Sequence, residues 1–283
     1  MGREDLIKIF ENTVWMCETN HKLKDKIKNS MACNKVISEK NADAILQNLT
    51  HERETGKEAE IIVSKKRSFE AASAYKGKHI SVLNFASATN PGGGVTKGAS
   101  AQEECLCRIS TLYKCISASE ITEAFHKKHR YALKTGKMNS FYNDDCIQTC
   151  DVTVFKSDTA KPVLLSEKDW FDVDVISCAA PNLRYMLQYD NNWKKTVTDK
   201  KLFDIYKKRI NRVLDIASSA KSDVIILGAF GCGAFANPPE LVAKAMHAAI
   251  DELKYDFETI ELAIYCSSRD TSNYEVFAKE FSA

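Results

Sequence analysis

Residues 84–104 read NFASATNPGGGVTKGASAQEE, and both the fold and the site can be read outward from this stretch. Three successive glycines, at 92–94, follow a proline just after a predicted strand. After seven intervening residues, Gln102, Glu103 and Glu104 open a predicted helix. Glycine has no Cβ, so its backbone can approach a ligand closely. A polar glycine loop beside paired carboxylates predicts a site that holds a sugar or a phosphate and then cleaves a bond.

The two glutamates have a second interpretation. Acidic residues in the first turn of a helix are stabilised by the helix dipole, by about 0.3–1 kcal/mol each. Glu103 and Glu104 could serve only this purpose. We favour the active-site interpretation because the triple glycine precedes them and a second glycine loop occurs later in the chain.

The second loop, GAFGCGAF at 228–235, lies between a predicted strand and a predicted helix. Its spacing is G-x-x-G-x-G, unlike the G-x-G-x-x-G of dinucleotide-binding folds. Bare backbone N–H groups beside a helix N-terminus can still hold a diphosphate, although a simple tight turn is the alternative. Ligands of open α/β sheets bind at the carboxyl ends of the strands. Both loops are therefore predicted to line one ligand site.

Strand-like and helix-like segments alternate through the last two-thirds of the chain, which indicates an α/β fold with a mostly parallel sheet. Segment 79–85, HISVLNF, has the apolar, β-branched character of a covered strand. We expect strands at 61–64, 79–85, 151–156, 173–179, 223–228 and 259–266, helices at 3–30, 69–75, 102–117, 199–219, 237–253 and from 272, and a loop at 50–58. Residues 118–145 show no clear pattern. Because no linker-like tract divides the chain, we expect a single domain over 1–283, with an N-terminal helical extension at 1–78 and a core at 79–283.

Composition excludes several classes of protein. The chain has 283 residues, 44% of them hydrophobic and 28% charged, which is ordinary for a globular protein. A net charge of +2 provides no global attraction to nucleic acid or to an anionic membrane. No apolar run approaches the ~18 residues of a membrane span, and the N-terminus lacks the apolar core of a secretory signal. We therefore expect an intracellular, cytoplasmic protein that is a monomer.

The ten cysteines are not arranged as metal ligands, since no C-x-x-C pair occurs and the histidines His126 and His129 have no suitably spaced further ligand. We interpret the cysteines as free, mostly buried thiols and do not expect a disulfide framework. A cysteine nucleophile at Cys232 or Cys178 is a third possibility for the chemistry, but no histidine is close in sequence to either.

Four segments together give a specific resemblance. They are NFASATNPGGG at 84–94, QEE at 102–104, SCAAPN at 177–182 and GAFGCGAFANPP at 228–239. The triple glycine, seven residues and QEE resemble the signature of poly(ADP-ribose) glycohydrolases, and the chain from Val82 onward resembles their compact bacterial-type branch. The resemblance implies a macrodomain fold, a mixed, mostly parallel sheet between helices, with ADP-ribose bound across the strand ends.

The resemblance also implies roles for individual residues. Glu104 would be the catalytic acid and Glu103 would position ribose hydroxyls beside the scissile bond. The triple glycine would wrap the distal ribose and the diphosphate, and the second loop would line the diphosphate. The implied substrate-binding residues are Asn84, Ala86, Asn90, Gly92, Gly93, Gly94, Gln102, Gly231, Cys232, Gly233, Ala234 and Phe235. Family members need no metal, and no cofactor is expected.

The activity that the resemblance implies is hydrolysis of ribose–ribose bonds in poly(ADP-ribose), with release of ADP-ribose. Adjacent helical residues point ~100° apart, so Glu103 and Glu104 are not expected to flank the sugar from opposite sides. One acid/base carboxylate with a positioning partner is the simpler scheme. Two alternatives stay open: a hydrolase that removes single ADP-ribose units from proteins, and a macrodomain that binds ADP-ribose without cleaving it. The accessory domain and tyrosine clasp of the animal enzymes have no clear counterpart here, which favours action on chain ends.

Overall fold

A seven-stranded sheet in the order β1-β4-β5-β3-β6-β7-β2 runs through the described residues of the computed structural model, which are 1–42, 58–185, 197–253, 257–267 and 270–282. The neighbours from β5 to β2 are parallel, whereas β4 is antiparallel to both β5 and β1. The prediction of a mixed, mostly parallel sheet is confirmed. The strands are β1 (Lys35–Ile37), β2 (Glu60–Ser64), β3 (Ile80–Phe85), β4 (Cys146–Val154), β5 (Phe171–Cys178), β6 (Val224–Leu227) and β7 (Thr259–Ala263).

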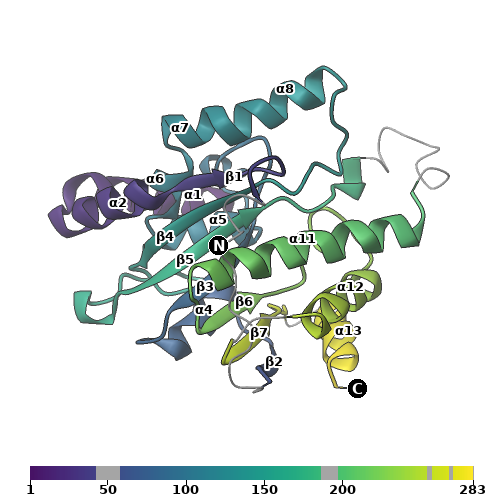
Figure 1. The fold of residues 1–283 in the computed structure, drawn as a ribbon. Coiled ribbons are helices and arrows are strands. Elements are labelled where there is room, and N and C mark those ends of the chain that lie inside the picture. The colour runs from purple at the N-terminus through teal and green to yellow at the C-terminus, as the bar shows by residue number, and fades with distance from the viewer. Residues whose placement is uncertain (43–57, 186–196, 254–256, 268–269, 283) are drawn as a thin grey trace.

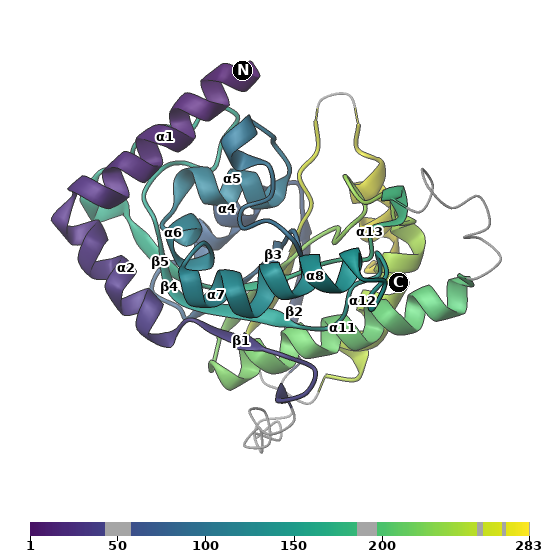
Figure 2. The ribbon, with the colours of Figure 1, turned by 90° about the horizontal axis from the view of Figure 1, so that it is seen from above.

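Helices cover both faces of the sheet (Figure 1). On one face α11, α12 and α13 pack over a large apolar cluster, and on the other face α1, α4, α5 and α6 pack over a second cluster. Figure 2 shows the same arrangement from above. The helices are α1 (Arg3–Thr19), α2 (His21–Cys33), α4 (Ser68–Ala72), α5 (Gln102–Ile109), α6 (Leu112–Ile116), α7 (Ser119–Ile121), α8 (Lys128–Lys134), α11 (Asp199–Ser219), α12 (Pro239–Asp251) and α13 (Ser272–Glu280). A π-helical stretch, Thr122–Lys127, joins α7 to α8.

Strand β6 is apolar throughout because both of its faces are buried, and β3 has the same character apart from Ser81 and Asn84. In β6, Val224 and Ile226 belong to the cluster under α4 and α5, whereas Ile225 and Leu227 belong to the cluster under α11 and α12. Side chains alternate between the faces of a sheet, so a strand covered on both sides reads as a continuous hydrophobic run. This explains why the segments ending at Phe85 and Leu227 were recognisable from sequence. Because β3 and β6 are parallel neighbours, their carboxyl ends place the two glycine loops side by side.

Two predicted helices are each divided by a polar residue. Helix 3–30 is divided at Asn20, which is extended and whose side chain accepts a hydrogen bond from the Leu23 backbone N–H at 3.2 Å. Asparagine is a preferred N-cap, so it starts a new helix where the apolar pattern alone predicted continuity. Helix 102–117 is divided at Ser110, which pairs with Val154 of the sheet.

Other segments differ from the prediction in extent. β4 begins at Cys146, five residues before the predicted strand, and residues 118–145, which showed no clear pattern, contain α7, the π-helical stretch and α8. β1 was not foreseen, because three residues are too few to show a period. The loop expected at 50–58 lies outside the described residues except for its last position.

The first 78 residues contribute β1 and β2 to the two edges of the sheet, as well as α1, α2 and α4. The sheet therefore contains strands from the predicted N-terminal extension as well as from the predicted core. The division of the chain into one domain with an N-terminal extension stays a prediction. Among the described segments, no helix is long and apolar enough to cross a membrane.

The expectation that the cysteines are free is wrong for one pair. Cys33, at the end of α2, forms a disulfide with Cys150 of β4, and their Cα atoms are 6.1 Å apart. The pair is separated by 117 residues in sequence, so only the packing of α2 on β4 brings the two sulfurs together. The other eight cysteines are free, and five of them are buried as expected: Cys17, Cys107, Cys115, Cys146 and Cys178.

Candidate active site

A cavity of about 1110 Å³ opens where the carboxyl ends of the parallel strands meet. Residues that directly follow β3, β5, β6 and β7 line it, among them Ser87, Ala180, Ala229 and Tyr265. The first turn of α5 forms another wall and carries both glutamates into it. The site therefore lies where parallel α/β sheets place their ligands.

Gln102 ties the start of α5 to the end of β3. Its Oε1 accepts a hydrogen bond from the Phe85 backbone N–H at 2.9 Å, and its Nε2 donates to the Leu83 carbonyl at 2.7 Å and to Ser68 Oγ at 3.0 Å. Every polar atom of this amide is therefore engaged with protein. We conclude that Gln102 fixes the helix on which the two carboxylates stand, although it also lines the cavity.

Glu103 is held by one donor from β3 and one from the loop after it. Its Oε2 accepts from the Ser87 backbone N–H at 2.8 Å, and its Oε1 accepts from Asn84 Nδ2 at 3.4 Å. Asn84 is fixed in turn by donating to Ser177 Oγ at 2.9 Å. Burial raises the pKa of Glu103 from its ordinary value of 4.5 to about 8, since the hydrogen bond from Ser87 only partly offsets it and the charge of Glu104 raises it further.

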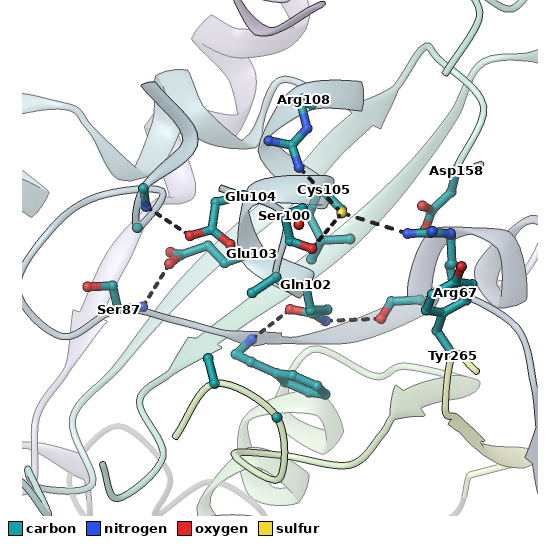
Figure 3. Close-up of a pocket in the computed structure, with 18 of the residues that line it drawn as sticks. Arg67, Ser87, Ser100, Gln102, Glu103, Glu104, Cys105, Arg108, Asp158 and Tyr265 are labelled. Carbon is teal, nitrogen blue, oxygen red and sulfur yellow. Dashed lines mark hydrogen bonds between the residues drawn. The ribbon is translucent and has the colours of Figure 1, made fainter. Parts of the chain in front are cut away.

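Glu104 is held at one oxygen only. Its Oε1 accepts from the Gly94 backbone N–H at 2.8 Å, whereas its Oε2 is buried and has no hydrogen-bond partner in the part of the chain that the structure describes. Figure 3 shows the two carboxylates side by side, each reached by a backbone N–H of the surrounding loop. One carboxyl oxygen of Glu104 thus has no protein partner within the described residues and can form a hydrogen bond with a ligand.

Both carboxylates lie very close to the backbone of Gly93. This residue has φ +57°, and an ideal Cβ there would lie 2.5 Å from Glu104 Oε1 and 3.1 Å from Glu103 Oε2. No other residue type would leave room for both side chains, and a left-handed φ also disfavours any residue with a Cβ. The two carboxylates thus meet at one point of the cavity wall.

The second glycine loop is shaped by a similar close approach. Gly231 has φ +79°, and a Cβ there would lie 2.5 Å from Tyr206 Oη and 2.6 Å from Ala180 Cβ. Asn237 closes the loop, because its Nδ2 donates to the Pro181 carbonyl at 2.7 Å and to the Gly231 carbonyl at 3.0 Å. The backbone of the second glycine loop therefore packs closely against Ala180, just after β5, and lines the cavity.

Most of the residues predicted for the site lie on the cavity wall: Asn90, Gly93, Gly94, Gln102, Glu103, Glu104, Gly231, Gly233, Ala234 and Phe235. Four predicted residues do not line it. Asn84 lies behind Glu103, Gly92 packs near the Tyr113 ring, Ala86 donates its N–H to the Cys178 carbonyl, and Cys232 is turned toward the Phe230 carbonyl.

The cysteine alternative receives no support from this geometry. Cys178 is fully buried in the sheet, and burial raises the pKa of Cys232 to about 12, so its thiol stays protonated. Within the described residues, neither thiol forms a hydrogen bond with a histidine. The same residues contain no group of three or more His, Cys, Asp or Glu side chains that could hold a metal ion.

Sequence reasoning missed the side chains that support the site from a distance. The loop after β3 is held from behind by α8 and the π-helical stretch: His126 Nδ1 lies 3.3 Å from the Ala88 carbonyl, and Arg130 donates to the Thr89 carbonyl at 2.6 Å. On the opposite rim, Arg67 stacks on the Tyr265 ring at 3.8 Å from the ring centre. These pairs are far apart in sequence and belong to no local motif, so only the fold could bring them together.

The raised pKa of Glu103 predicts how the protein's stability depends on pH. The folded protein holds this proton more tightly than the unfolded chain, so stability is lost as pH rises from about 4.5 to about 8. At about 1.4 kcal/mol per pKa unit, the loss is about 5 kcal/mol at most. We expect Glu103→Gln, which cannot ionise, to be more stable relative to the native protein at pH 8.5 than at pH 4.5. Urea unfolding at both pH values measures this, and a stability difference independent of pH would refute it.

Comparison with known proteins agrees with the motifs and the site. The profile of the microbial-type catalytic domain of poly(ADP-ribose) glycohydrolase (PARG) matches residues 4–157, more than half of the chain. The matched residues include the triple glycine and both glutamates. The chain belongs to this family. The predicted family resemblance is therefore confirmed, and the chain is a PARG-type glycohydrolase. No curated protein sequence matches the chain.

Solved structures of the family share the fold. The poly(ADP-ribose) glycohydrolase of Thermomonospora curvata, bound to the inhibitor ADP-HPD, is 24% identical and superposes with a TM-score of 0.82 over 98% of this chain and 100% of that one. The PARG of Deinococcus radiodurans in complex with ADP-ribose is 25% identical, with a TM-score of 0.75 over 90% of this chain and 97% of that one. The macrodomain-like architecture is thus confirmed along the chain.

Proposed function

We propose that this protein hydrolyses the ribose–ribose O-glycosidic bonds of poly(ADP-ribose) and releases ADP-ribose, with Glu104 as general acid and base. The observation that carries the proposal is the carboxyl group of Glu104, whose Oε1 is fixed by Gly94 and whose Oε2 has no partner within the described residues. The ADP-ribose complex of the Deinococcus radiodurans family member supports the choice of ligand.

In the proposed reaction, Glu104 donates its proton to the oxygen of the leaving ribose as the C–O bond breaks. The anomeric carbon passes through an oxocarbenium-like state and is then attacked by water, whose proton returns to Glu104. Glu103 holds the ribose hydroxyls, and its raised pKa keeps it protonated below about pH 8, so it can donate a hydrogen bond as well as accept one. The substrate diphosphate stabilises the positive sugar by its charge.

The two glycine loops would bind the diphosphate and distal ribose through backbone N–H groups, with the apolar side chains of Ala234 and Phe235 on the cavity wall. The proposed scheme uses no metal and no cofactor. We also propose that the chain works as one domain and acts on chain ends. Its monomeric state, its cytoplasmic location and the absence of nucleic-acid or membrane partners remain predictions from the sequence.

Incubation with two substrates tests the proposed function. We expect the native protein to release free ADP-ribose from poly(ADP-ribose), measured by chromatography, and to leave protein that carries a single ADP-ribose unit unchanged. Release from the singly modified protein alone would establish the mono-ADP-ribosyl hydrolase instead. Tight ADP-ribose binding with no release from either substrate would establish a binding module.

A further inference from the structure

The twenty residues between Glu123 and Asp144 include no acidic residue and five basic ones. The basic residues are Lys127, Lys128, Arg130, Lys134 and Lys137. They lie on the end of the π-helical stretch, on α8 and in the turn that follows it, along the top of the molecule in Figure 1. The chain as a whole has a net charge of only +2, so this is a local concentration of positive charge. A local patch attracts anionic partners even where the whole molecule does not.

Two of these basic residues already have carboxylate partners. Lys127 pairs with Glu123, and Lys128 pairs with Asp145 at 2.7 Å. Within the described residues, the other three form no ion pair and their side chains are exposed: Arg130, Lys134 and Lys137. Their charges are therefore available to an anionic ligand.

An exposed aromatic ring lies among the three unpaired charges. Tyr131 is 61% exposed, and Lys137 Nζ lies 5.5 Å from the centre of its ring. Arg130 and Lys134 are four residues apart and hence on one side of α8. Proteins bind chains of nucleotides with this combination, because bases stack on the ring and phosphates pair with the cations. We call Arg130, Tyr131, Lys134 and Lys137 the α8 surface.

The segment that carries the α8 surface runs along the mouth of the cavity. At one end, Arg130 donates to the Thr89 carbonyl at 2.6 Å, and the next residue of that loop, Asn90, is exposed and lines the cavity. At the other end, the ring centres of Tyr142 and Phe235 are 6.5 Å apart, and Phe235 lines the cavity from the second glycine loop. The α8 surface thus borders the cavity between the two glycine loops.

The bond that the proposed function cleaves would lie at the same rim. Glu104 is held by the N–H of Gly94, in the loop that also contains Asn90. When the removed ADP-ribose unit fills the cavity, the oxygen that Glu104 protonates belongs to the next unit of the polymer. That unit must therefore leave across the rim, and it carries an adenine ring and a negatively charged diphosphate.

We propose that the α8 surface binds the ADP-ribose unit next to the one that is removed. The adenine of this unit stacks on Tyr131, and its diphosphate pairs with Lys134, Lys137 and the remaining N–H groups of Arg130. The inference rests on the proposed function and extends it. It makes two consecutive units the preferred substrate and gives a single unit on a protein no such contact.

Binding of one unit and of two units to the same protein tests the proposal. Glu104→Gln is used so that neither ligand is cleaved, and calorimetry gives the Kd of ADP-ribose and of a two-unit oligomer. We expect the oligomer to bind at least about 10-fold more tightly, as added charge-assisted hydrogen bonds imply. Lys134→Glu combined with Lys137→Glu should abolish this advantage and keep the affinity for ADP-ribose, because both lysines lie outside the cavity lining.

Two exposed lysines of α2 supply the matched control. Lys24→Glu combined with Lys28→Glu changes the net charge equally, and we expect it to leave both affinities within about 2-fold. An oligomer that binds no more tightly than ADP-ribose, or an advantage that survives the α8 substitutions, would overturn the proposal. An equal loss in the α2 variant would also overturn it, since the effect would then be one of total charge.

The aromatic contact is tested separately. Tyr131→Ala should weaken oligomer binding about 5-fold or more, whereas Tyr131→Phe should retain it, because stacking requires the ring and not the hydroxyl. Equal losses in the two variants would contradict stacking. A short single-stranded RNA of equal charge should compete only weakly with the oligomer, and equal competition would assign the surface to nucleic acid instead. Because these readouts measure binding, the α8 surface can fail while hydrolysis by the native protein stands, and the reverse is also true.

Discussion

Replacing Glu104 by glutamine is expected to lower kcat on poly(ADP-ribose) by about 10²–10⁴-fold, the usual contribution of a positioned acid or base. Glutamine keeps the shape of the side chain, and its Oε1 can still accept from the Gly94 N–H, as Glu104 does at 2.8 Å. It has no proton to donate to the leaving ribose. We therefore expect ADP-ribose affinity to change by no more than a few-fold while turnover is lost.

The measurement combines kinetics and binding on the same protein. Release of ADP-ribose from polymer gives kcat, and calorimetry gives the affinity for ADP-ribose. Glu120→Gln is the matched control, since Glu120 is exposed on α7 and remote from the cavity lining. Turnover by Glu104→Gln at the native rate would show that another group donates the proton.

Gly93→Ala is expected to have the second largest effect, with activity reduced on the order of 10²-fold or more. The new Cβ would lie 2.5 Å from Glu104 Oε1 and 3.1 Å from Glu103 Oε2, so both carboxylates would have to move. A displacement of about 1 Å at a reacting group can cost 10²-fold in rate. The left-handed φ of +57° adds strain of about 1–3 kcal/mol to the folded state.

A second glycine separates the causes of that effect. Gly136 also has a left-handed φ, of +69°, but a Cβ there would meet nothing within 4 Å, so Gly136→Ala carries the backbone strain without the clash. The Gly136→Ala variant should keep nearly native activity. A loss of activity in Gly136→Ala as large as in Gly93→Ala would attribute the effect to the backbone alone.

The parts of the site that could be predicted from sequence are those encoded within one loop and the helix that follows it. One short segment, residues 92–104, contains the triple glycine, Gln102 and the two glutamates. The strands β3 and β6 determine where the two glycine loops begin. The helix at Asp199–Ser219 was predicted with its observed bounds, because Thr198 caps its start and the amphipathic pattern is unbroken.

The remaining features depend on packing between distant segments. The sequence could not show that Glu103 and Glu104 would converge on Gly93, that Arg67 would stack on Tyr265, or that Cys33 would pair with Cys150. The first predicted helix is broken by a local feature, the N-cap residue Asn20. The prediction missed this break because it followed the apolar periodicity, which continues across Asn20. Thus the catalytic motifs could be recognised in the sequence, whereas the raised pKa of Glu103 follows from burial that only the fold shows.

Glu104 as the proton donor can be tested directly with a substrate that needs no proton. In such a substrate, the anomeric carbon of ADP-ribose carries a nitrophenol, which leaves as a stable anion, in place of the next ribose. Cleavage by the native protein and by Glu104→Gln should then differ by about 10-fold or less, although the same variant loses about 10²–10⁴-fold on polymer. An equally large loss on both substrates would contradict the assignment of Glu104 as the acid.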